Sequence, residues 1–443
     1  MKAIQRTFLA LLFGLTVLWL LANASALSTV SGFFPWRNLL VQYSGVLGMG
    51  VMSVAMMLAI RQPSLESRLH GLDKMYRLHK WLGITGLVLA VLHWLCSQAP
   101  KWMVGAGLLT RPQRGPAPVQ TLDIFRFFQS QRGLAEQVGE WAFYALLALL
   151  ALALIQRFPY RLVFKTHRWM AVVYLVLVLH AVVLLSFANW ATPLGLVMAA
   201  LMLGGSFGAV LSLFRRIGVT RTASGVIEQV EHLSGVHVNA VTVQLTDRWS
   251  GHQAGQFAFV TFDPDEGSHP FTISSAWQND GKLVFLIKAL GDYTRTLASS
   301  LKPGGVVKVE GPYGRFTFDS PTRRQIWIGG GIGITPFVAR MKELATQPDG
   351  RMIDLFHTTT DVDDAALQSL AADAKAADVR LHLLIDARDG YLSGERLRAA
   401  VPDWRNAEVW FCGPARFGQM IRKHLLAHGM PAHHFHQELF AMR

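Results

Sequence analysis

Six long apolar segments occupy most of the first half of the sequence, and they constrain the fold more than any other feature. Each approaches the ~20 residues that an α-helix needs to cross a lipid bilayer. The hydrophobic fraction of the whole chain, 51%, agrees with a large membrane part. We therefore expect a six-helix membrane bundle, formed by residues at about 7–24, 39–60, 80–97, 138–156, 168–186 and 193–214.

Basic residues are concentrated in the loops between these segments. Residues 1–219 contain 19 Lys and Arg against 5 Asp and Glu, whereas residues 220–443 contain 23 and 24. Because excess Lys and Arg marks the cytoplasmic side, the basic loops at 61–80 and 157–168, the N-terminus and the second half should face the cytoplasm. This pattern predicts a multi-pass protein of the plasma (inner) membrane. It argues against nucleic-acid binding, and it implies no obligate protein partner.

The first apolar segment allows a second interpretation. A basic start, an apolar run and the small residues of "ANASALS" also resemble a cleaved signal peptide. We favour a retained helix because the apolar run is long. Cleavage would leave five spans, and the rest of the chain would keep the same sides of the membrane.

Four histidines lie in or at the ends of the third and fifth apolar segments. His79 and His93 are 14 residues apart, and His167 and His180 are 13 residues apart. In a helix these spacings correspond to about 21 Å and 20 Å. Both helices run in the same direction, so His79 should share one level with His167, and His93 should share a second level with His180.

Two such levels predict two stacked haems b, each with two axial histidines. A histidine in hydrocarbon is costly unless it is paired or coordinated, and neutral imidazole is a strong ligand for haem iron. One difficulty is geometric. Fourteen residues return an ideal helix to within about 40° of its starting direction, but thirteen leave the two side chains about 140° apart. We therefore expect the fifth helix to tilt, to bend or to serve two offset haems.

The second half has the pattern of a soluble protein. Alternating segments such as "VNAVTVQLT" and "GQFAFVTF" continue to about residue 318 and predict a small antiparallel β-barrel. Strands and helices then alternate, as in an α/β domain with a parallel sheet. We expect a membrane domain at 1–218, a barrel at 219–320 and an α/β domain at 321–443. The two cysteines, Cys96 and Cys412, lie in different halves and predict no disulfide framework.

A glycine-rich turn follows the first strand of the α/β domain, in "IWIGGGIGITPF". Glycines let the backbone approach a pyrophosphate, which a helix N-terminus favours electrostatically. The spacing departs from the common GxGxxG pattern, and no acidic residue about 20 positions further on is clearly a ribose ligand. By itself this turn also fits an ordinary βα connection.

Five motifs occur in the second half of the sequence, in this order: "HPFTISS", "IKALGDYT", "GPYG", "GGGIGITPF" and "FCGP". In order and spacing they resemble the flavin and nicotinamide domains of the ferredoxin–NADP reductase superfamily. Together with the four histidines, the chain resembles the NADPH oxidase/ferric reductase family of transmembrane flavocytochromes b over roughly residues 40–443. The resemblance implies two haems b with His79, His93, His167 and His180 as ligands, FAD, and NAD(P)H as the electron donor.

The resemblance also implies roles for individual residues. His269, Pro270, Phe271 and Thr272 should line the flavin ring, with the Thr272 hydroxyl at its reactive edge and Ser274 and Ser275 just beyond. Gly291 and Thr294 match the flavin diphosphate turn; Lys288 either adds charge there or is an exposed strand residue. Gly330, Gly331, Gly333, Thr335 and Pro336 match the turn that binds the pyrophosphate of the nicotinamide dinucleotide. Cys412, Gly413 and Pro414 should lie beside the nicotinamide, and Phe440 should cover the flavin. His269, Thr272, Cys412 and Phe440 are thus expected next to the reacting rings.

These expectations define a transmembrane oxidoreductase. Electrons should pass from cytoplasmic NAD(P)H to FAD, then to the His79/His167 haem, the His93/His180 haem and an outer acceptor. With all axial positions filled by histidine, the acceptor should be reduced at the haem edge, and it is either dioxygen, giving superoxide, or ferric iron and its chelates. The residues after the second parallel strand, "FHTTTDVDDA", leave NADH and NADPH open.

Two other classes of function also fit parts of the sequence. The chain could be a haem b anchor that exchanges electrons with quinone or a periplasmic partner, although an anchor would not need its own hydride-donor site. A transporter or sensor with an accessory domain fits the six spans. It leaves the paired histidines unexplained.

Overall fold

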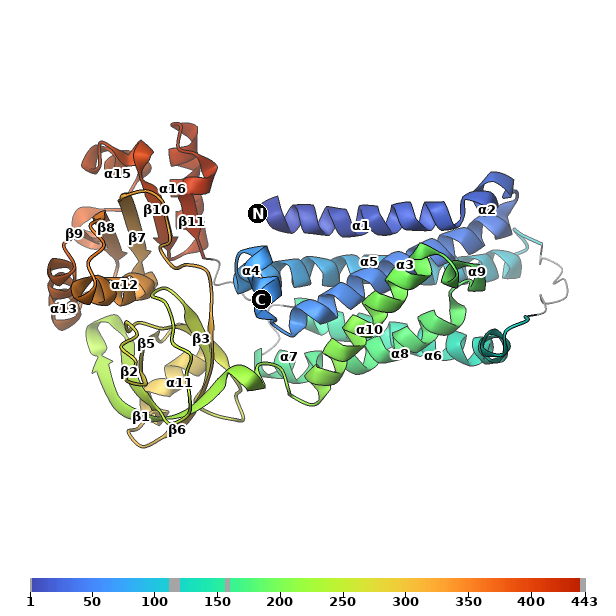
Figure 1. Ribbon diagram of the computed structural model, residues 1–443, viewed down its shortest axis with the longest axis horizontal. Helices are drawn as coiled ribbons and strands as arrows, with labels where there is room; N and C mark the ends of the chain where they lie inside the picture. The colour runs from blue at the N-terminus through green and yellow to red at the C-terminus, as the bar shows by residue number, and fades with distance from the viewer. Residues whose placement is uncertain (1, 111–119, 156–159, 439–443) are drawn as a thin grey trace. The chain divides into compact units, whose positions relative to one another are not determined.

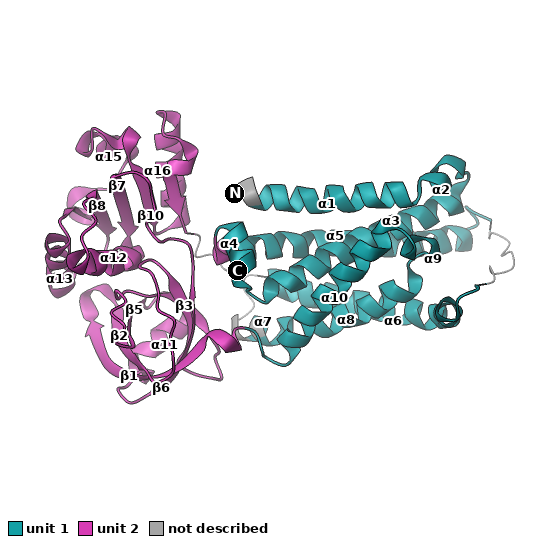
Figure 2. Cartoon of the chain, in the orientation of Figure 1, with its two compact units in different colours: residues 1–70, 74–217, 442–443 teal, residues 71–73, 218–441 magenta. Residues whose placement is uncertain are grey.

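The computed structural model describes residues 2–110, 120–155 and 160–438. The chain divides into two compact units, one formed mainly by residues 1–217 and the other mainly by residues 218–441 (Figure 2). Each unit has its own hydrophobic core and is described by itself.

The first unit is entirely helical (Figure 1). Within the described residues, six helices are long and apolar enough to cross a membrane, which confirms the expected number of apolar helices. The helices are α1 (Lys2–Ala22), α2 (Ala24–Thr29), α3 (Phe33–Ala59), α4 (Pro63–Leu69), α5 (Leu72–Gly105), α6 (Asp123–Leu154), α7 (Tyr160–His167), α8 (Met170–Leu184), α9 (Phe187–Trp190) and α10 (Pro193–Leu213).

Two features of these helices differ from the sequence expectation. Helices α5 and α6 extend well beyond their apolar segments, because the polar residues that flank each segment continue the helix. The helix expected to carry both His167 and His180 is interrupted: α7 ends at His167 and α8 begins at Met170. The short turn between them lies next to one of the predicted ligands.

Small residues allow the membrane helices to pack closely. A side chain at Gly208 on α10 would lie 2.7 Å from the Met56 carbonyl oxygen of α3, and one at Gly205 would lie 2.1 Å from the Tyr174 hydroxyl of α8. Such close approach through small residues is typical of helix packing in membranes.

The second unit begins with an antiparallel sheet of strand order β4-β3-β6-β1-β2-β5. Its buried face is formed by alternate residues of the strands, such as Val241, Val243, Leu283 and Phe285. The edge strands approach each other at a bridge between Ile273 and Phe285, an arrangement compatible with the expected barrel. The elements are β1 (Thr222–Leu233), β2 (Val238–Leu245), β3 (Phe257–Thr261), β4 (His269–Thr272), β5 (Lys282–Lys288), α11 (Asp292–Ser300) and β6 (Val306–Tyr313).

A parallel sheet of order β11-β10-β7-β8-β9 follows, as predicted. Apolar side chains on its two faces pack against the crossover helices and form two hydrophobic clusters. The elements are β7 (Arg324–Gly330), α12 (Thr335–Thr346), β8 (Met352–Thr359), α13 (Asp364–Ala376), β9 (Val379–Ile385), α14 (Asp386–Asp389), α15 (Gly394–Ala400), β10 (Glu408–Cys412), α16 (Ala415–Ala427) and β11 (Phe435–Gln437).

Candidate functional site

The membrane unit brings its four histidines together in the two pairs that the spacing predicts. The ring centroids of His79 and His167 are 6.0 Å apart, and those of His93 and His180 are 6.2 Å apart. We call these the inner and the outer pair. An imidazole nitrogen binds a metal at about 2 Å, so two rings that share one metal ion from opposite sides have centres about 6 Å apart. Both pairs have this separation.

Backbone carbonyl groups hold three of the four imidazoles. The Nδ1 atom of His79 lies 2.9 Å from the Ala55 carbonyl oxygen, that of His93 lies 3.1 Å from the Val41 oxygen, and that of His180 lies 2.8 Å from the Ala135 oxygen. An Nδ1–H that donates to a carbonyl fixes the tautomer in which Nε2 carries the free lone pair, as a metal ligand requires. These carbonyl partners were not predicted.

The partners on α3 have a spacing that the sequence does show. Val41 and Ala55 are 14 residues apart, like His93 and His79, and α3 and α5 run in opposite directions. One straight helix can therefore anchor both histidines of the other. Ser44, one turn from Val41, places its hydroxyl 3.1 Å from the same His93 Nδ1.

The turn between α7 and α8 resolves much of the geometric difficulty raised by the 13-residue spacing. The amide of Trp169 donates to the Thr166 carbonyl (3.0 Å) and that of Ala171 to the Arg168 carbonyl (3.1 Å). These are i→i+3 bonds, and a residue in such a 3₁₀ turn rotates the chain by about 120° instead of 100°. The added rotation moves His180 toward the direction of His167.

Two glycines make room for the outer pair. A Cβ at Gly139 on α6 would lie only 1.9 Å from His180 Nδ1, and a Cβ at Gly45 on α3 would lie 3.3 Å from His93 Cε1. Any side chain at Gly139 would displace the imidazole from Ala135. Neither glycine was predicted as a site residue. Each lies opposite a histidine in the fold, and that position explains why a glycine is needed there.

A cavity of about 60 Å³ lies at the inner pair. Its walls are apolar apart from His79, His167 and Tyr174, whose hydroxyl is engaged 2.8 Å from Ser53 Oγ. Within the described part of the chain, no group of three or more His, Cys, Asp or Glu side chains could hold a metal ion. Two neighbouring imidazoles could supply two ligands to one metal, and the four nitrogens of haem b fit the remaining positions.

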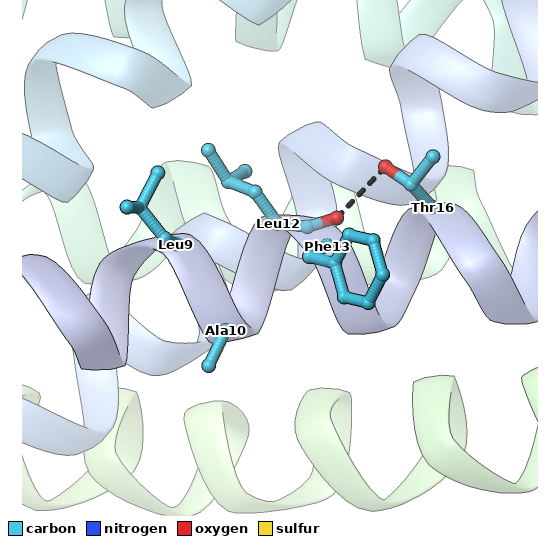
Figure 3. Close-up of a pocket in the computed structure, with 5 residues that line it drawn as sticks. All are labelled: Leu9, Ala10, Leu12, Phe13 and Thr16. Atoms are coloured by element: carbon cyan, nitrogen blue, oxygen red, sulfur yellow. Dashed lines mark hydrogen bonds between the residues drawn. The ribbon is translucent and has the colours of Figure 1, made fainter.

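A second hollow in the membrane unit lies along α1 and offers no such chemistry (Figure 3). Its lining is apolar apart from Thr16. The Thr16 hydroxyl is already engaged by the Leu12 carbonyl, at 2.8 Å, and by the Tyr43 hydroxyl, at 2.9 Å.

Arg37 lies near the outer pair and has a structural role. Pro100 within α5 lacks the N–H that would bond to the Cys96 carbonyl. The Arg37 guanidinium takes its place: Nε donates to the Cys96 oxygen at 3.0 Å, and Nη2 donates to the Ser97 oxygen at 3.2 Å.

In the second unit, the predicted flavin residues lie on β4 and just after it. Successive side chains of a strand point to opposite faces, so the side chains of His269 and Phe271 share one face, and those of Pro270 and Thr272 share the other. The His269 ring stacks on Tyr293, with ring centroids 4.2 Å apart, and burial lowers the pKa of His269. The neutral ring is therefore favoured.

Ser274 and Ser275 connect the end of β4 to β5. The Ser274 amide donates to the Val284 carbonyl at 2.7 Å, and the Ser275 hydroxyl accepts from the Val284 amide at 3.1 Å. These contacts place both residues in the framework of the sheet beside Thr272.

The predicted flavin diphosphate turn forms the N-terminus of α11. The Thr294 hydroxyl accepts hydrogen bonds from the amides of Leu290 (3.0 Å) and Gly291 (2.9 Å). A Cβ at Gly291 would meet nothing within 4 Å, so the turn faces open space. Lys288 does not add a free charge to this turn, because its Nζ lies 2.6 Å from Asp361 Oδ2.

The glycine-rich turn after β7 packs directly against the "FCGP" segment. A Cβ at Gly333 would lie 2.2 Å from the Cys412 carbonyl oxygen, and one at Gly330 would lie 2.9 Å from Pro414 Cδ. The amide of Gly330 lies 3.0 Å from the position of a Cβ at Gly413. By contrast, Gly331 has a φ of +55° and open space around it. Thr335 and Pro336 begin α12 and are buried.

Cys412 and Glu438 lie close together at this edge. Burial and the nearby Glu438 carboxylate raise the pKa of the Cys412 thiol well above its usual range. A Cβ at Gly314 would lie 3.1 Å from Glu438 Oε1, so Glu438 lies between the "GPYG" and "FCGP" motifs. Phe440, expected to cover the flavin, lies outside the described residues.

Two protein families match the chain. Residues 44–178 match the family described as "Ferric reductase like transmembrane component", and residues 229–317 match the "FAD-binding domain" family. The first match contains His79, His93 and His167 and ends two residues before His180. The second contains the predicted flavin motifs.

Several curated proteins resemble part of the chain. A glycine betaine monooxygenase reductase subunit of Chromohalobacter salexigens is 25% identical over 42% of this chain and 55% of its own length. The ferredoxin reductase component of a 3-ketosteroid-9-alpha-monooxygenase of Rhodococcus rhodochrous is 25% identical over 50% of this chain and 65% of its own length. The chain thus spans less than two thirds of the length of these relatives.

Solved structures show more remote likeness. A flavohemoglobin of Malassezia yamatoensis with bound FAD and heme has a TM-score of 0.49 and 17% identity, covering 91% of this chain and 98% of its own. The FAD/NAD-binding domain of a nitric oxide dioxygenase of Vibrio cholerae has a TM-score of 0.43 and 20% identity, covering 49% and 97%.

The membrane helices and the matched families define a class, that of membrane proteins with a ferric reductase-like transmembrane component and a FAD-binding domain. Within that class, the resemblance read from the sequence is confirmed. The chain combines a ferric reductase-like transmembrane component at residues 44–178 with a FAD-binding domain at residues 229–317.

Proposed function

We propose that the protein transfers electrons across the membrane, from NAD(P)H through FAD and two bis-histidine haems b to an acceptor on the opposite side. The observation that carries this proposal is the pair of facing imidazoles at each of two levels, with centroids 6.0 and 6.2 Å apart. No purely structural role explains four histidines so arranged between apolar helices.

FAD would accept a hydride and release single electrons, and haem iron would carry one electron at a time. The residues of this chain supply position and exclusion. His79 and His167 would hold one haem, and His93 and His180 would hold the other. The apolar helix faces around them would keep water out of both sites.

In the second unit, the chain would bring two dinucleotides together. The open turns at Gly291 and Gly331 offer backbone to phosphate groups. Thr272 on β4 and Cys412 at the end of β10 would lie beside the flavin and nicotinamide rings. The other predicted contacts, from His269, Pro270, Phe271, Ser274, Ser275, Thr294, Thr335, Pro336, Gly413, Pro414 and Phe440, are part of the same proposal.

Because two histidines would hold each haem, the acceptor would be reduced at the haem edge. We propose ferric iron or its chelates, or dioxygen reduced to superoxide, as acceptors. We also propose that the protein lies in the plasma (inner) membrane with its dehydrogenase part in the cytoplasm, as the basic loops indicate.

A reduced-minus-oxidised absorption spectrum of the purified protein, with haem and flavin quantified, tests this function. The expected result is two low-spin haems b and one FAD per chain, both haems being reduced by NAD(P)H. A single haem, or high-spin iron, would contradict the four-ligand assignment. Anaerobic reoxidation by ferric chelates, compared with reoxidation by dioxygen, then identifies the acceptor.

A further inference from the structure

We propose that the protein uses NADH rather than NADPH, and that Asp361 sets this preference. The inference rests on the proposed function, because it takes the glycine-rich turn after β7 to hold the pyrophosphate of the nicotinamide dinucleotide. NADH and NADPH differ only in a phosphate on the 2′-oxygen of the adenosine ribose. The segment of the protein that meets this ribose therefore decides between them.

The end of β8 lies beside the glycine-rich turn. Strands β7 and β8 are adjacent and parallel (Figure 1), and Gly330 is in register with Thr358. The residues that follow the two strands therefore lie at one edge of the sheet, with the strands about 4.8 Å apart. In sheets of this kind a dinucleotide binds at the carboxyl ends of the strands, and the residues after the second strand meet its adenosine ribose. In this chain those residues are 360–364, "TDVDD".

Hydrogen bonds fix Asp361 at this edge. The Asp361 amide donates to the Thr359 hydroxyl at 3.2 Å, and the same hydroxyl donates to the Asp361 carbonyl at 2.8 Å. Two residues further on, the Asp363 carboxylate accepts hydrogen bonds from the amides of Ala366, at 3.1 Å, and Gly235, at 3.0 Å. The segment is thus held at both ends, and a ligand meets a carboxylate whose position is already set.

Asp361 also neutralises a basic side chain that reaches this edge. Lys288 Nζ on β5 lies 2.6 Å from Asp361 Oδ2, and the Asp361 side chain remains 33% exposed. This contact lowers the pKa of Asp361, so the carboxylate is ionised at neutral pH. The ammonium group is therefore not available to a 2′-phosphate. A carboxylate has about four acceptor sites, so sites remain for the 2′-hydroxyl that NADH has instead.

The rest of this edge is acidic as well. The segments 360–364 and 386–390, which follow β8 and β9, contain five acidic residues: Asp361, Asp363, Asp364, Asp386 and Asp389. They contain one basic residue, Arg388, whose Nη2 donates to Asp389 Oδ2 at 3.0 Å. A 2′-phosphate would bring further negative charge to these carboxylates, and like charges placed together in a binding site lower affinity. The hydroxyl of NADH meets no such repulsion.

The preference should appear in binding and not in the hydride step. The hydride leaves the nicotinamide ring, at the opposite end of the molecule from the 2′-phosphate, and the ring is the same in both coenzymes. An interaction made equally before and during the reaction changes KM and leaves kcat unchanged. We therefore expect the two coenzymes to differ in Kd and KM and to have similar kcat values.

Titration calorimetry of the purified, oxidised full-length protein with NAD⁺ and NADP⁺ tests the inference without turnover. NAD⁺ should bind about tenfold more tightly than NADP⁺, and NADH should have a correspondingly lower KM than NADPH in reduction of the protein. Equal affinities, or tighter binding of NADP⁺, would overturn the inference. If neither nucleotide bound and neither reduced form reduced the protein, the proposed function would fail instead.

Variants of the ion pair test the role of Asp361. Asp361→Asn makes the Lys288 ammonium available, and it should raise the affinity for NADP⁺ about tenfold and lower that for NAD⁺. Adding Lys288→Gln to this variant should remove the gain for NADP⁺. An unchanged NADP⁺ affinity in Asp361→Asn, or a gain that survived in the double variant, would show that this pair does not set the preference.

Asp378→Asn is the matched control. Asp378 is exposed and directly precedes β9, so it lies at the opposite edge of the sheet. Its φ of 53° is one that asparagine also adopts. This variant removes one negative charge from the same domain and should change neither affinity. A gain for NADP⁺ equal to that of Asp361→Asn would show that overall charge, and not Asp361, sets the preference.

Discussion

The membrane unit and the second unit build their candidate sites differently, the first from side chains and the second from backbone. At the histidine pairs, side chains form the site and backbone carbonyls hold them in place. At the glycine-rich turn, the backbone forms the site, and the absence of side chains lets Gly333 and Cys412 meet. The first kind of site should fail when one side chain is removed, and the second when one is added.

The largest effect is expected from removal of an outer ligand. His93→Ala should halve the haem content, because one imidazole alone does not hold low-spin haem between apolar helices. Haem per chain is measured by absorption after extraction. His70→Asn, in the loop before α5 where the residue has a φ of 61°, is the control and should keep the full content.

Adding one methyl group beside a ligand should have the next largest effect. In Gly139→Ala the new Cβ would lie 1.9 Å from His180 Nδ1, so the imidazole or the helix must move, at a cost of about 1–3 kcal/mol. We expect partial loss of the outer haem in a haem-retention assay. Gly133→Ala on the same helix meets nothing within 4 Å. Equal haem loss in both variants would show that α6 tolerates no change, and the side-chain account of this site would fail.

The same addition in the soluble unit tests the backbone site. Gly333→Ala would place a Cβ 2.2 Å from the Cys412 carbonyl oxygen, and we expect a loss of about 3 kcal/mol in stability or nicotinamide binding. Gly331→Ala has room but a φ of +55°, and should cost only about 1 kcal/mol. The two variants are compared by thermal unfolding and by the KM for NAD(P)H. A larger cost at Gly331 would contradict the packing described for the turn.

Acid should weaken the soluble unit through His357. Burial lowers the pKa of His357 to about 4, and its Nδ1 lies 3.1 Å from the Gly329 carbonyl oxygen. The folded state therefore binds fewer protons than the unfolded one. The stabilisation is present above pH ~6.5 and is lost as pH falls toward ~4, by about 3 kcal/mol in total.

Unfolding free energies between pH 7 and 4.5 check this expectation. His357→Asn keeps a side-chain N–H for the Gly329 carbonyl and does not titrate in this range. Its stability should therefore fall less steeply with acid than that of the wild type. Parallel curves for the two proteins would rule out His357 as the source.

The smallest effect is expected at Ser44. Its hydroxyl is a second partner for His93 Nδ1, beside the Val41 carbonyl. Ser44→Ala should keep both haems. It should shift the reduction midpoint potential of the haem at the outer pair only slightly, since the Val41 carbonyl remains. Loss of haem in this variant would mean that the hydroxyl, and not the backbone, anchors His93.

Much of the membrane site could be predicted from the sequence. The length of the apolar segments determines the helices, and the spacing of the histidines along them determines the two levels. The pairing of His79 with His167 and of His93 with His180 follows from those two features alone. The turn at Arg168 and Trp169 could not be predicted, since the segment contains no glycine or proline to interrupt the helix.

In the soluble unit the order of motifs predicts the domains, but contacts between distant segments remain hidden. Lys288 and Asp361 are 73 residues apart and form an ion pair. Adding charge at the flavin turn was one of the two roles expected for Lys288, and the pair occupies its ammonium group. The glycines of the turn were assigned to phosphate binding. For Gly333 the structure gives a different reason, close packing against the end of β10.

The separation of the two histidine levels also has an electrical consequence. Levels about 20 Å apart span roughly two thirds of a hydrocarbon core of ~30 Å. An electron that passes outward between them moves through most of the membrane voltage, which is worth about 2.3 kcal/mol per charge for each 100 mV across the full thickness. With the interior negative, the voltage itself drives the electron outward. Every turnover would then act as an electric current that lowers the membrane potential, and turnover would slow as the membrane depolarises.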